Sequence, residues 1–165
     1  MQLIDKLITK SLLLNYSNYE VLIMKPTYLY HGSQYKFDIV KPHKASGNRS
    51  CDSYEAIYAY EKFEDVIPFA LPIRWYPDEP NGKLSFHAND GKTCIEYGSL
   101  NPNGKGYIYK MDASTFQKIE YGQYISSVSV KPVEIYEIDV RDYWNTVRFS
   151  DEALLIQQKL YGTNT

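Results

Sequence analysis

Apolar and polar positions along this chain follow the two-residue period of strands more often than the period of helices. Runs rich in β-branched and aromatic residues, separated by Gly, Pro and Asn, indicate about six or seven strands. The strand-like segments are residues 28–31, 57–60, 73–76 (a strand or a sheet edge), 84–88, 93–97, 106–111, 121–125 and 130–140. Among these, 84–88 and 93–97 alternate like paired strands joined by a turn at 89–91.

Helical spacing of apolar residues occurs near both ends of the chain and once in between. The three segments are residues 2–14, 61–71 and 143–161. Pro68 falls in the middle of the second segment, so this helix begins near Pro68 or is kinked there. Asp112 is a suitable N-cap for a short helical turn at 112–116. Either Asp139 or Asp142 could cap the last helix.

Together these elements predict a strand-dominated α+β domain over residues 24–165. Residues 1–23 are expected to be an N-terminal amphipathic helix and linker. A start at Met24 would leave the remaining pattern complete, so this segment is expected to be dispensable for folding. Residues 42–53 combine Pro, Gly, Asn, Ser and Lys, which is typical of a flexible loop, and 98–105 are also rich in turn residues.

The composition is that of a folded protein without a strong charge bias. Of 165 residues, 44% are hydrophobic and 23% charged, with a net charge of -2, which argues against a general nucleic-acid binder. No apolar run approaches the ~20 residues of a membrane helix, and no signal-peptide pattern is present, so we expect a cytoplasmic protein. Cys51 and Cys94 are then free thiols, although a disulfide between them stays open. The scattered Cys and His residues give no zinc pattern.

One stretch, Tyr28-Leu29-Tyr30-His31-Gly32-Ser33, points to a binding site. Strand-forming residues end at His31, and Gly32 lets the backbone turn without a Cβ clash. A histidine at a strand end, beside an accessible backbone, could offer an imidazole and backbone polar groups to a small ligand. The alternative is an ordinary strand and turn with His31 as a half-buried polar residue.

Two motifs in order resemble the ADP-ribosyltransferase superfamily, in its His–Tyr branch of poly-ADP-ribose polymerases, diphtheria-type toxins and rifampin ADP-ribosyltransferases. They are Tyr30-His31-Gly32-Ser33 and Ile57-Tyr58-Ala59, the latter followed by a helix. The resemblance spans about residues 27–140. It implies a split antiparallel β-sheet domain with short helices at both ends, which binds NAD as a substrate.

The same resemblance implies roles for individual residues. His31 would hydrogen-bond a ribose hydroxyl of NAD, and Gly32 would offer its backbone to the nicotinamide amide. Tyr58 would stack on the nicotinamide ring. Ser33 and Tyr60 complete the expected NAD-contacting set, and His31, Tyr58 and Gln123 are expected to be the catalytic residues.

The third motif of the family carries a glutamate at the start of a late strand. The matching stretch here is Gln123-Tyr124-Ile125, so Gln123 stands at the glutamate position, and the nearest carboxylate is Glu120. Gln123 could hydrogen-bond a ribose 2′-hydroxyl, but it could not supply a negative charge or act as a base. This replacement leaves open whether the chain is an enzyme.

Several functions fit these residues. The first is transfer of ADP-ribose from NAD to an unknown acceptor, a protein or a small molecule, chosen by the loops at 41–53 and 112–122. The second is an inactive NAD-, ADP-ribose- or protein-binding module on the same fold. An RNA 2′-phosphotransferase-like activity would require more arginines, and a plain interaction domain is a further alternative.

Two interpretations are open for the basic residues of the loop between the motifs. Lys44 and Arg49 either contact the pyrophosphate of NAD or are solvated loop charges. His43 and His87 are expected to be surface or hydrogen-bonded histidines.

Overall fold

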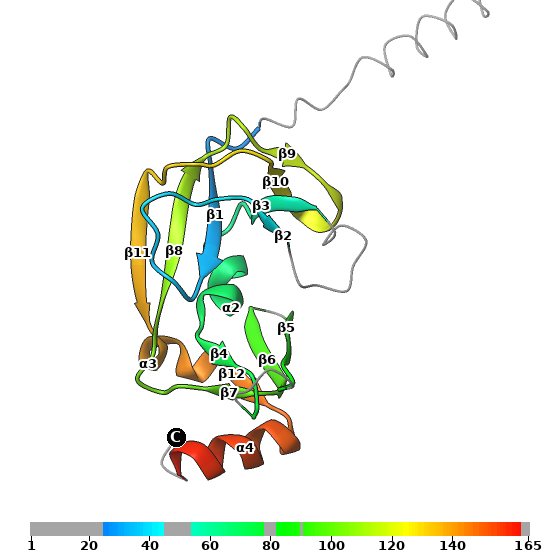
Figure 1. Cartoon of the computed structure of the whole chain (residues 1–165), viewed down its shortest axis with the longest axis vertical. Coiled ribbons are helices and arrows are strands. Elements are labelled where there is room, and N and C mark those ends of the chain that lie inside the picture. The colour runs from blue at the N-terminus through cyan, green and yellow to red at the C-terminus, as the bar shows by residue number, and fades with distance from the viewer. Residues whose placement is uncertain (1–24, 45–53, 78–81, 90, 163–165) are drawn as a thin grey trace, which may run out of the picture.

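The fold is built around a three-stranded antiparallel sheet in the order β1-β8-β11 (Figure 1). The computed structural model describes residues 25–44, 54–77, 82–89 and 91–162. The strands of this sheet are β1 (Tyr28–Ser33), β8 (Lys105–Asp112) and β11 (Glu134–Asp139). Because side chains alternate between the two faces of a strand, β8 supplies Ile108 to one core cluster and Tyr109 to the other. Both faces of the central strand are therefore covered.

A second antiparallel sheet packs next to β1, in the order β2-β3-β10-β9. Its strands are β2 (His43–Lys44), β3 (Glu55–Ala59), β10 (Tyr124–Ser126) and β9 (Gln117–Lys118). Tyr30 and Tyr60 form a bridge between the two sheets, in which each backbone N–H donates to the carbonyl of the other residue at 2.8 and 2.9 Å. This bridge brings the end of β1, and with it His31, against β3.

The lower part of the molecule in Figure 1 holds a third sheet and the last helix. The sheet contains β12 (Val147–Phe149), β6 (Lys92–Tyr97) and β5 (Ser85–Asn89), and a short pair joins β4 (Ile73–Arg74) to β7 (Ser99–Leu100). Helix α4 (Asp151–Tyr161) buries Ala153, Ile156 and Gln157 against β6 and β7. Ser150 caps α4 by accepting a hydrogen bond from the Ala153 N–H at 3.1 Å.

A short helical segment lies at the centre of the molecule and packs on the first sheet (Figure 1). It consists of a 3-10 turn, η2 (Glu64–Val66), and α2 (Ile67–Ala70), with Pro68 in the first turn of α2. Two glycines make the close approach to the sheet possible. A Cβ at Gly32 would lie 2.3 Å from the Val66 carbonyl oxygen, and one at Gly106 would lie 1.8 Å from that of Ala70. The prediction that the helix begins near Pro68 is confirmed.

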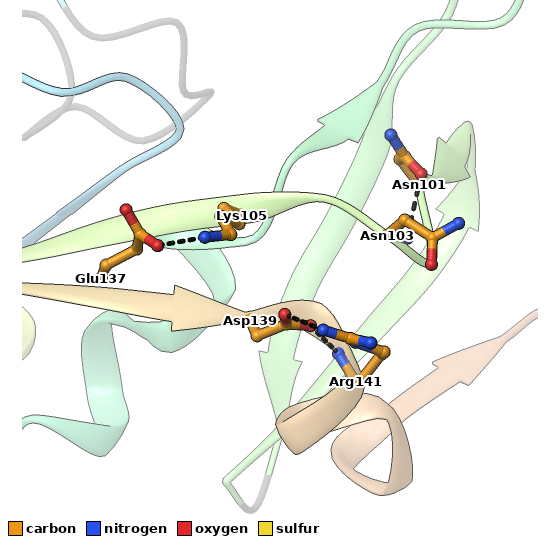
Figure 2. A network of polar contacts seen from close by, with 6 residues as sticks. All are labelled: Asn101, Asn103, Lys105, Glu137, Asp139 and Arg141. Atoms are coloured by element: carbon orange, nitrogen blue, oxygen red, sulfur yellow. Dashed lines mark hydrogen bonds and ion pairs between the residues drawn. The ribbon is translucent and has the colours of Figure 1, made fainter.

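A network of polar contacts ties together the ends of β8 and β11 (Figure 2). Lys105 and Glu137 form an ion pair across the two strands. Asp139 caps α3 (Val140–Tyr143) by accepting from the Arg141 N–H at 3.0 Å, and it also pairs with the Arg141 guanidinium at 2.6 Å. The hydrogen bonds from Arg141 hold the pKa of the Asp139 carboxyl below its usual range. Asp139 therefore caps α3, and the prediction that Asp139 or Asp142 caps the last helix is wrong, because Ser150 caps α4.

The strand-dominated α+β class is confirmed, but several local predictions are wrong. The described residues contain twelve strands, because three two-residue strands (β2, β7 and β9) and the three-residue β12 were not predicted. Two of these lie in segments predicted as loops, β2 within 42–53 and β7 within 98–105. β2 pairs with β3, and β7 pairs with β4. Strands this short are defined by their pairing with distant segments, so the local sequence shows no strand pattern for them.

Other boundaries differ for local reasons. Residues 143–161 are not one helical segment, because β12 pairs with β6 in parallel before α4 begins. Asp112 ends β8 and accepts from the Ser114 N–H at 2.8 Å, which makes a turn in place of the predicted helix. The strand expected at 121–125 starts only at Tyr124, after a 3-10 turn, η3 (Glu120–Gly122). The strand expected at 130–140 starts only at Glu134.

Several sequence predictions lie wholly or partly outside the described residues, among them the proposed role of Arg49. Others are the amphipathic helix at 2–14, most of the loop at 42–53, and Cys51. Cys94 is a free thiol in the structure. Within the described part of the chain, no helix is long and apolar enough to cross a membrane.

Candidate ligand-binding site around His31

His31 is held in one orientation by the backbone of β3. Its side chain is 8% exposed, and Nδ1 lies 2.8 Å from the Tyr58 carbonyl oxygen. Because a carbonyl can only accept, Nδ1 carries the proton and Nε2 presents a lone pair. Burial lowers the pKa of His31 to about 4, against a smaller upward effect of the Tyr58 hydrogen bond. At neutral pH His31 is therefore an uncharged ring whose Nε2 accepts hydrogen bonds.

Gly32 and Ser33 follow His31 at the end of β1. On the face of β1 opposite to His31, the position of Gly32 is closed by the Val66 carbonyl, which a Cβ would meet. The glycine is thus required by the packing of η2 on β1, independently of any ligand. The Ser33 hydroxyl accepts from the Tyr35 N–H at 3.1 Å and stabilises the turn that follows.

Tyr58, Tyr60 and Gln123 belong to one face of the second sheet. Ile125 pairs with Tyr58, so the alternation of side chains puts Gln123 beside Tyr60 on that face. The Gln123 amide is 5% exposed and donates from Nε2 to the Tyr60 hydroxyl at 2.5 Å. The Tyr60 ring stacks on Phe69 of α2 at 6.0 Å, and the Tyr58 hydroxyl donates to the Tyr54 carbonyl at 3.0 Å.

These side chains line one large cleft of about 1790 Å³. The structure brings together in its wall all of the predicted site residues: His31, Gly32, Ser33, Tyr58, Tyr60 and Gln123. Pockets for small molecules usually measure about 300–1000 Å³, so this cleft is larger than a typical one. Much of its remaining wall is aromatic, from Tyr35, Phe37, Phe69, Trp75 and Phe86.

The carboxylates are distributed differently from what the sequence suggested. Glu120, the carboxylate nearest to Gln123 in sequence, is exposed in η3 and does not line the cleft. Glu64 and Asp65 of η2 do line it. The sequence did not indicate this position, because it depends on the packing of η2 against Gly32.

Tyr109 is a supporting residue that sequence reasoning missed. It lies opposite His31 in the β1–β8 register, fully buried, with its ring 6.0 Å from that of His31. Its hydroxyl donates to the Tyr35 carbonyl at 2.6 Å and accepts from the Phe37 N–H at 2.8 Å, so it fixes the loop after β1. Burial raises the pKa of this phenol. Among 17 tyrosines nothing local distinguishes it.

The histidines also divide into two kinds. His43 is exposed, as expected, yet its ring lies 6.2 Å from that of His31 and lines the cleft. His87 pairs with Glu96 at 3.5 Å on an exposed part of the β5–β6 hairpin. No group of three or more potential metal ligands occurs within the described ranges.

Comparison of the chain with protein-family models, with curated protein sequences and with solved structures found no significant match. The resemblance to the ADP-ribosyltransferase superfamily therefore rests on the motifs of the sequence. The structure adds that the first two motifs lie against each other, since His31 hydrogen-bonds the Tyr58 carbonyl.

Proposed function

We propose that this protein is an NAD-dependent ADP-ribosyltransferase that transfers ADP-ribose to an unknown protein or small-molecule acceptor. The observation that carries the proposal is the direct contact between the two motif strands, His31 Nδ1 to the Tyr58 carbonyl, at the wall of one cleft. The acceptor is the Tyr58 backbone carbonyl, so the hydrogen bond brings the two motif segments together at this cleft. The ADP-ribosyltransferase type of split sheet is part of the same proposal.

The chemistry of the pair suits recognition of a ribose. Uncharged His31 accepts at Nε2 from a ribose hydroxyl, and Tyr58 offers an aromatic surface of the kind on which a nicotinamide ring stacks. Cleavage of the nicotinamide–ribose bond builds positive charge on the ribose, and nearby carboxylates lower the energy of that state. Glu64 and Asp65 line the same cleft, but they come from η2, on the face of β1 opposite to His31.

The second candidate is a module that binds NAD or ADP-ribose without turnover. The specific observation in its favour is Gln123, which is buried and tied to Tyr60 at the position where the family carries a glutamate. A neutral amide there avoids the cost of burying a carboxylate, but it also forgoes the charge that would stabilise the transition state. This candidate predicts binding and stabilisation by NAD with no release of nicotinamide.

Two measurements test both candidates. Isothermal calorimetry measures NAD binding, and chromatography measures nicotinamide release from NAD by the same preparation. Transferase function predicts both signals in the wild type, with large losses in His31→Ala and Tyr58→Ala. Gln158→Ala, on the exposed side of α4, is the matched control and is expected to behave as the wild type. A wild-type protein that neither binds nor cleaves NAD removes both candidates.

A further inference from the structure

An exposed apolar patch lies where the loop between β1 and β2 meets the start of β11. Its five side chains are all exposed to solvent, and we call them the Phe37 patch: Tyr35, Phe37, Ile39, Val133 and Ile135. The loop crosses β8 on the sheet face that carries His31 (Figure 1). A contiguous group of exposed apolar residues marks an interaction surface, whereas single ones are common on any protein.

One end of the Phe37 patch is built around the buried ring of Tyr109. The Phe37 ring stacks on that ring with 6.1 Å between the centroids, and the Tyr35 ring lies 6.4 Å from that of Phe37. Ile135 is the β11 partner of Tyr109, so the two side chains lie on the same face of the sheet. Three of the five exposed side chains therefore surround one buried aromatic ring.

The other end is held by a bridge between the same two segments. Val40 and Val130 exchange backbone hydrogen bonds at 3.0 and 2.9 Å, and both side chains are buried. Ile39 directly precedes this bridge in the sequence, and Val133 follows it by three residues. The bridge therefore fixes the backbone on which these two exposed side chains are carried.

The chain enters the described structure close to this patch. The Thr27 carbonyl accepts from the Ala113 N–H at 3.0 Å, and the Val133 N–H donates to the Lys110 carbonyl at 2.8 Å. β1 and β11 flank the same end of β8. Two strand spacings and three residues of rise therefore separate Thr27 from Val133, which amounts to about 15 Å.

Residues 2–14 supply a second apolar surface. Their apolar residues recur every three or four positions: Leu3, Ile4, Leu7, Ile8 and Leu12. A helix with this pattern is stabilised when its apolar stripe is buried against another apolar surface. The connecting residues 15–24 can span up to about 33 Å, which exceeds the separation between the chain entry and the patch. The exposed apolar residues of α4 lie at the opposite end of the molecule from the start of β1 (Figure 1).

We propose that residues 2–14 dock as a helix on the Phe37 patch of their own chain. The inference does not depend on the proposed function, because it uses only the exposed apolar surface, the entry point of the chain and the pattern of residues 2–14. Tyr35, Phe37 and Ile39 also line the cleft, so the docked segment lies along one edge of the cleft.

Hydrogen-exchange mass spectrometry of the full chain tests this inference. The amides of residues 2–14 are expected to exchange at least about tenfold more slowly than those of an unstructured chain. Val133→Asp and Ile39→Asp put a charge into the patch and are expected to abolish this protection. Leu155→Asp, at an exposed apolar position on α4, is the matched control and is expected to keep it.

A second pair of variants changes the segment itself. Leu7→Gln removes an apolar contact and is expected to abolish the protection, whereas Lys6→Gln, on the polar side of the predicted helix, is expected to keep it. Leu, Lys and Gln have similar helix propensities, so an isolated helix would respond equally to both changes. The exchange of β8 in the same spectra identifies any variant that has unfolded, and the remaining variants then decide.

Three results would overturn the inference. Residues 2–14 that exchange at the unprotected rate in the wild type do not dock at all. Protection that survives in both patch variants places the segment elsewhere, on α4 if Leu155→Asp removes it. Protection that falls on dilution of the protein shows docking on a second copy of the chain. Protection that is independent of concentration and is lost in Val133→Asp, Ile39→Asp and Leu7→Gln supports docking within the chain.

Discussion

The imidazole of His31 is joined to the backbone of Tyr58 by a 2.8 Å hydrogen bond from Nδ1 to the carbonyl oxygen. The bond lies next to the Tyr30–Tyr60 bridge, the point where the first and second sheets meet. This hydrogen bond therefore links the two sheets, and it also leaves Nε2 as the ring nitrogen that can accept from a ligand. Substitutions at this position are expected to change stability as well as binding.

The first prediction concerns acid pH. The pKa of His31 is about 4 in the folded protein against 6.5 for the free side chain, so between these values only the unfolded chain takes up the proton. Stability is then fully present above about pH 6.5 and falls as the pH decreases towards about 4, by about 3 kcal/mol in total. Urea unfolding at about pH 7 and about pH 4 measures the loss.

The control for this prediction is His31→Gln, which has no titrating ring. Carboxylates with a lowered pKa, such as Glu61 and Asp139, also destabilise the protein in acid, but they do so in both proteins. The difference between wild type and variant therefore isolates His31. A pH dependence of equal size in the two proteins would show that His31 titrates normally and is less well buried than described.

The second prediction concerns the contact between η2 and β1. Gly32→Ala puts a Cβ 2.3 Å from the Val66 carbonyl oxygen and 2.9 Å from the Ala70 nitrogen, both backbone atoms that cannot swing aside. We expect a loss of about 3 kcal/mol, typical of a severe overpacking change, in the free energy of unfolding. Chemical denaturation measures it.

Gly91→Ala is the matched control for this change. Gly91 has a φ of +68° but open space around its Cβ position, so only the left-handed backbone opposes alanine there, at a cost of about 1 kcal/mol. Equal losses in the two variants would mean that η2 moves away freely and that Gly32 is not needed for its packing.

The third prediction concerns a buried amide that joins α4 to β7. Gln157 is fully buried, with Nε2 donating to the Leu100 carbonyl at 2.8 Å and Oε1 accepting from the Leu100 N–H at 2.9 Å. Gln157→Leu keeps the volume but leaves both backbone groups without a partner, so we expect a loss of about 2–4 kcal/mol. The exposed neighbour provides the control, because Gln158→Leu is expected to change stability by less than about 0.5 kcal/mol. A small loss for Gln157→Leu would indicate that water replaces the amide.

Local patterns were sufficient for part of the fold and of the candidate site. The strand that carries His31 and the helix around Pro68 are encoded by neighbouring residues, so both were predicted, although β1 continues through Gly32 to Ser33 where a turn at Gly32 was expected. The β5–β6 hairpin was recognised for the same reason, since its two alternating strands are joined by a turn of a few residues.

What could not be predicted depends on pairing between distant segments. Nothing near Tyr109 in sequence shows that it lies opposite His31, and nothing near Val147 shows a parallel partner in β6. The positions of Lys41 and His43 in the cleft follow from the pairing of β2 with β3, which a loop-like composition conceals. A polar residue such as Gln157 is not expected from the sequence to be buried. The structure explains its burial, because its amide hydrogen-bonds the backbone N–H and carbonyl of Leu100 in β7.

The last prediction distinguishes a transferase from a binding module at Gln123. Gln123→Glu introduces a carboxylate at a buried position beside the Tyr60 hydroxyl, which can donate to it in place of accepting from the amide. If NAD binds as proposed, the new charge stabilises the developing positive charge on the ribose, and nicotinamide release is expected to rise by about tenfold or more. Because burial raises the pKa of a carboxyl, the gain is expected to increase with pH.

Glu120→Gln is the control, because Glu120 does not line the cleft and its loss is expected to leave the rate unchanged. A rate that falls in Glu120→Gln and does not rise in Gln123→Glu would make Glu120 the working carboxylate and overturn the assignment of Gln123. If wild type and Gln123→Glu both bind NAD and neither releases nicotinamide, the cleft holds the dinucleotide without the strain or charge that cleavage requires. The protein is then a binding module, and its function lies in what NAD occupancy does to its surface.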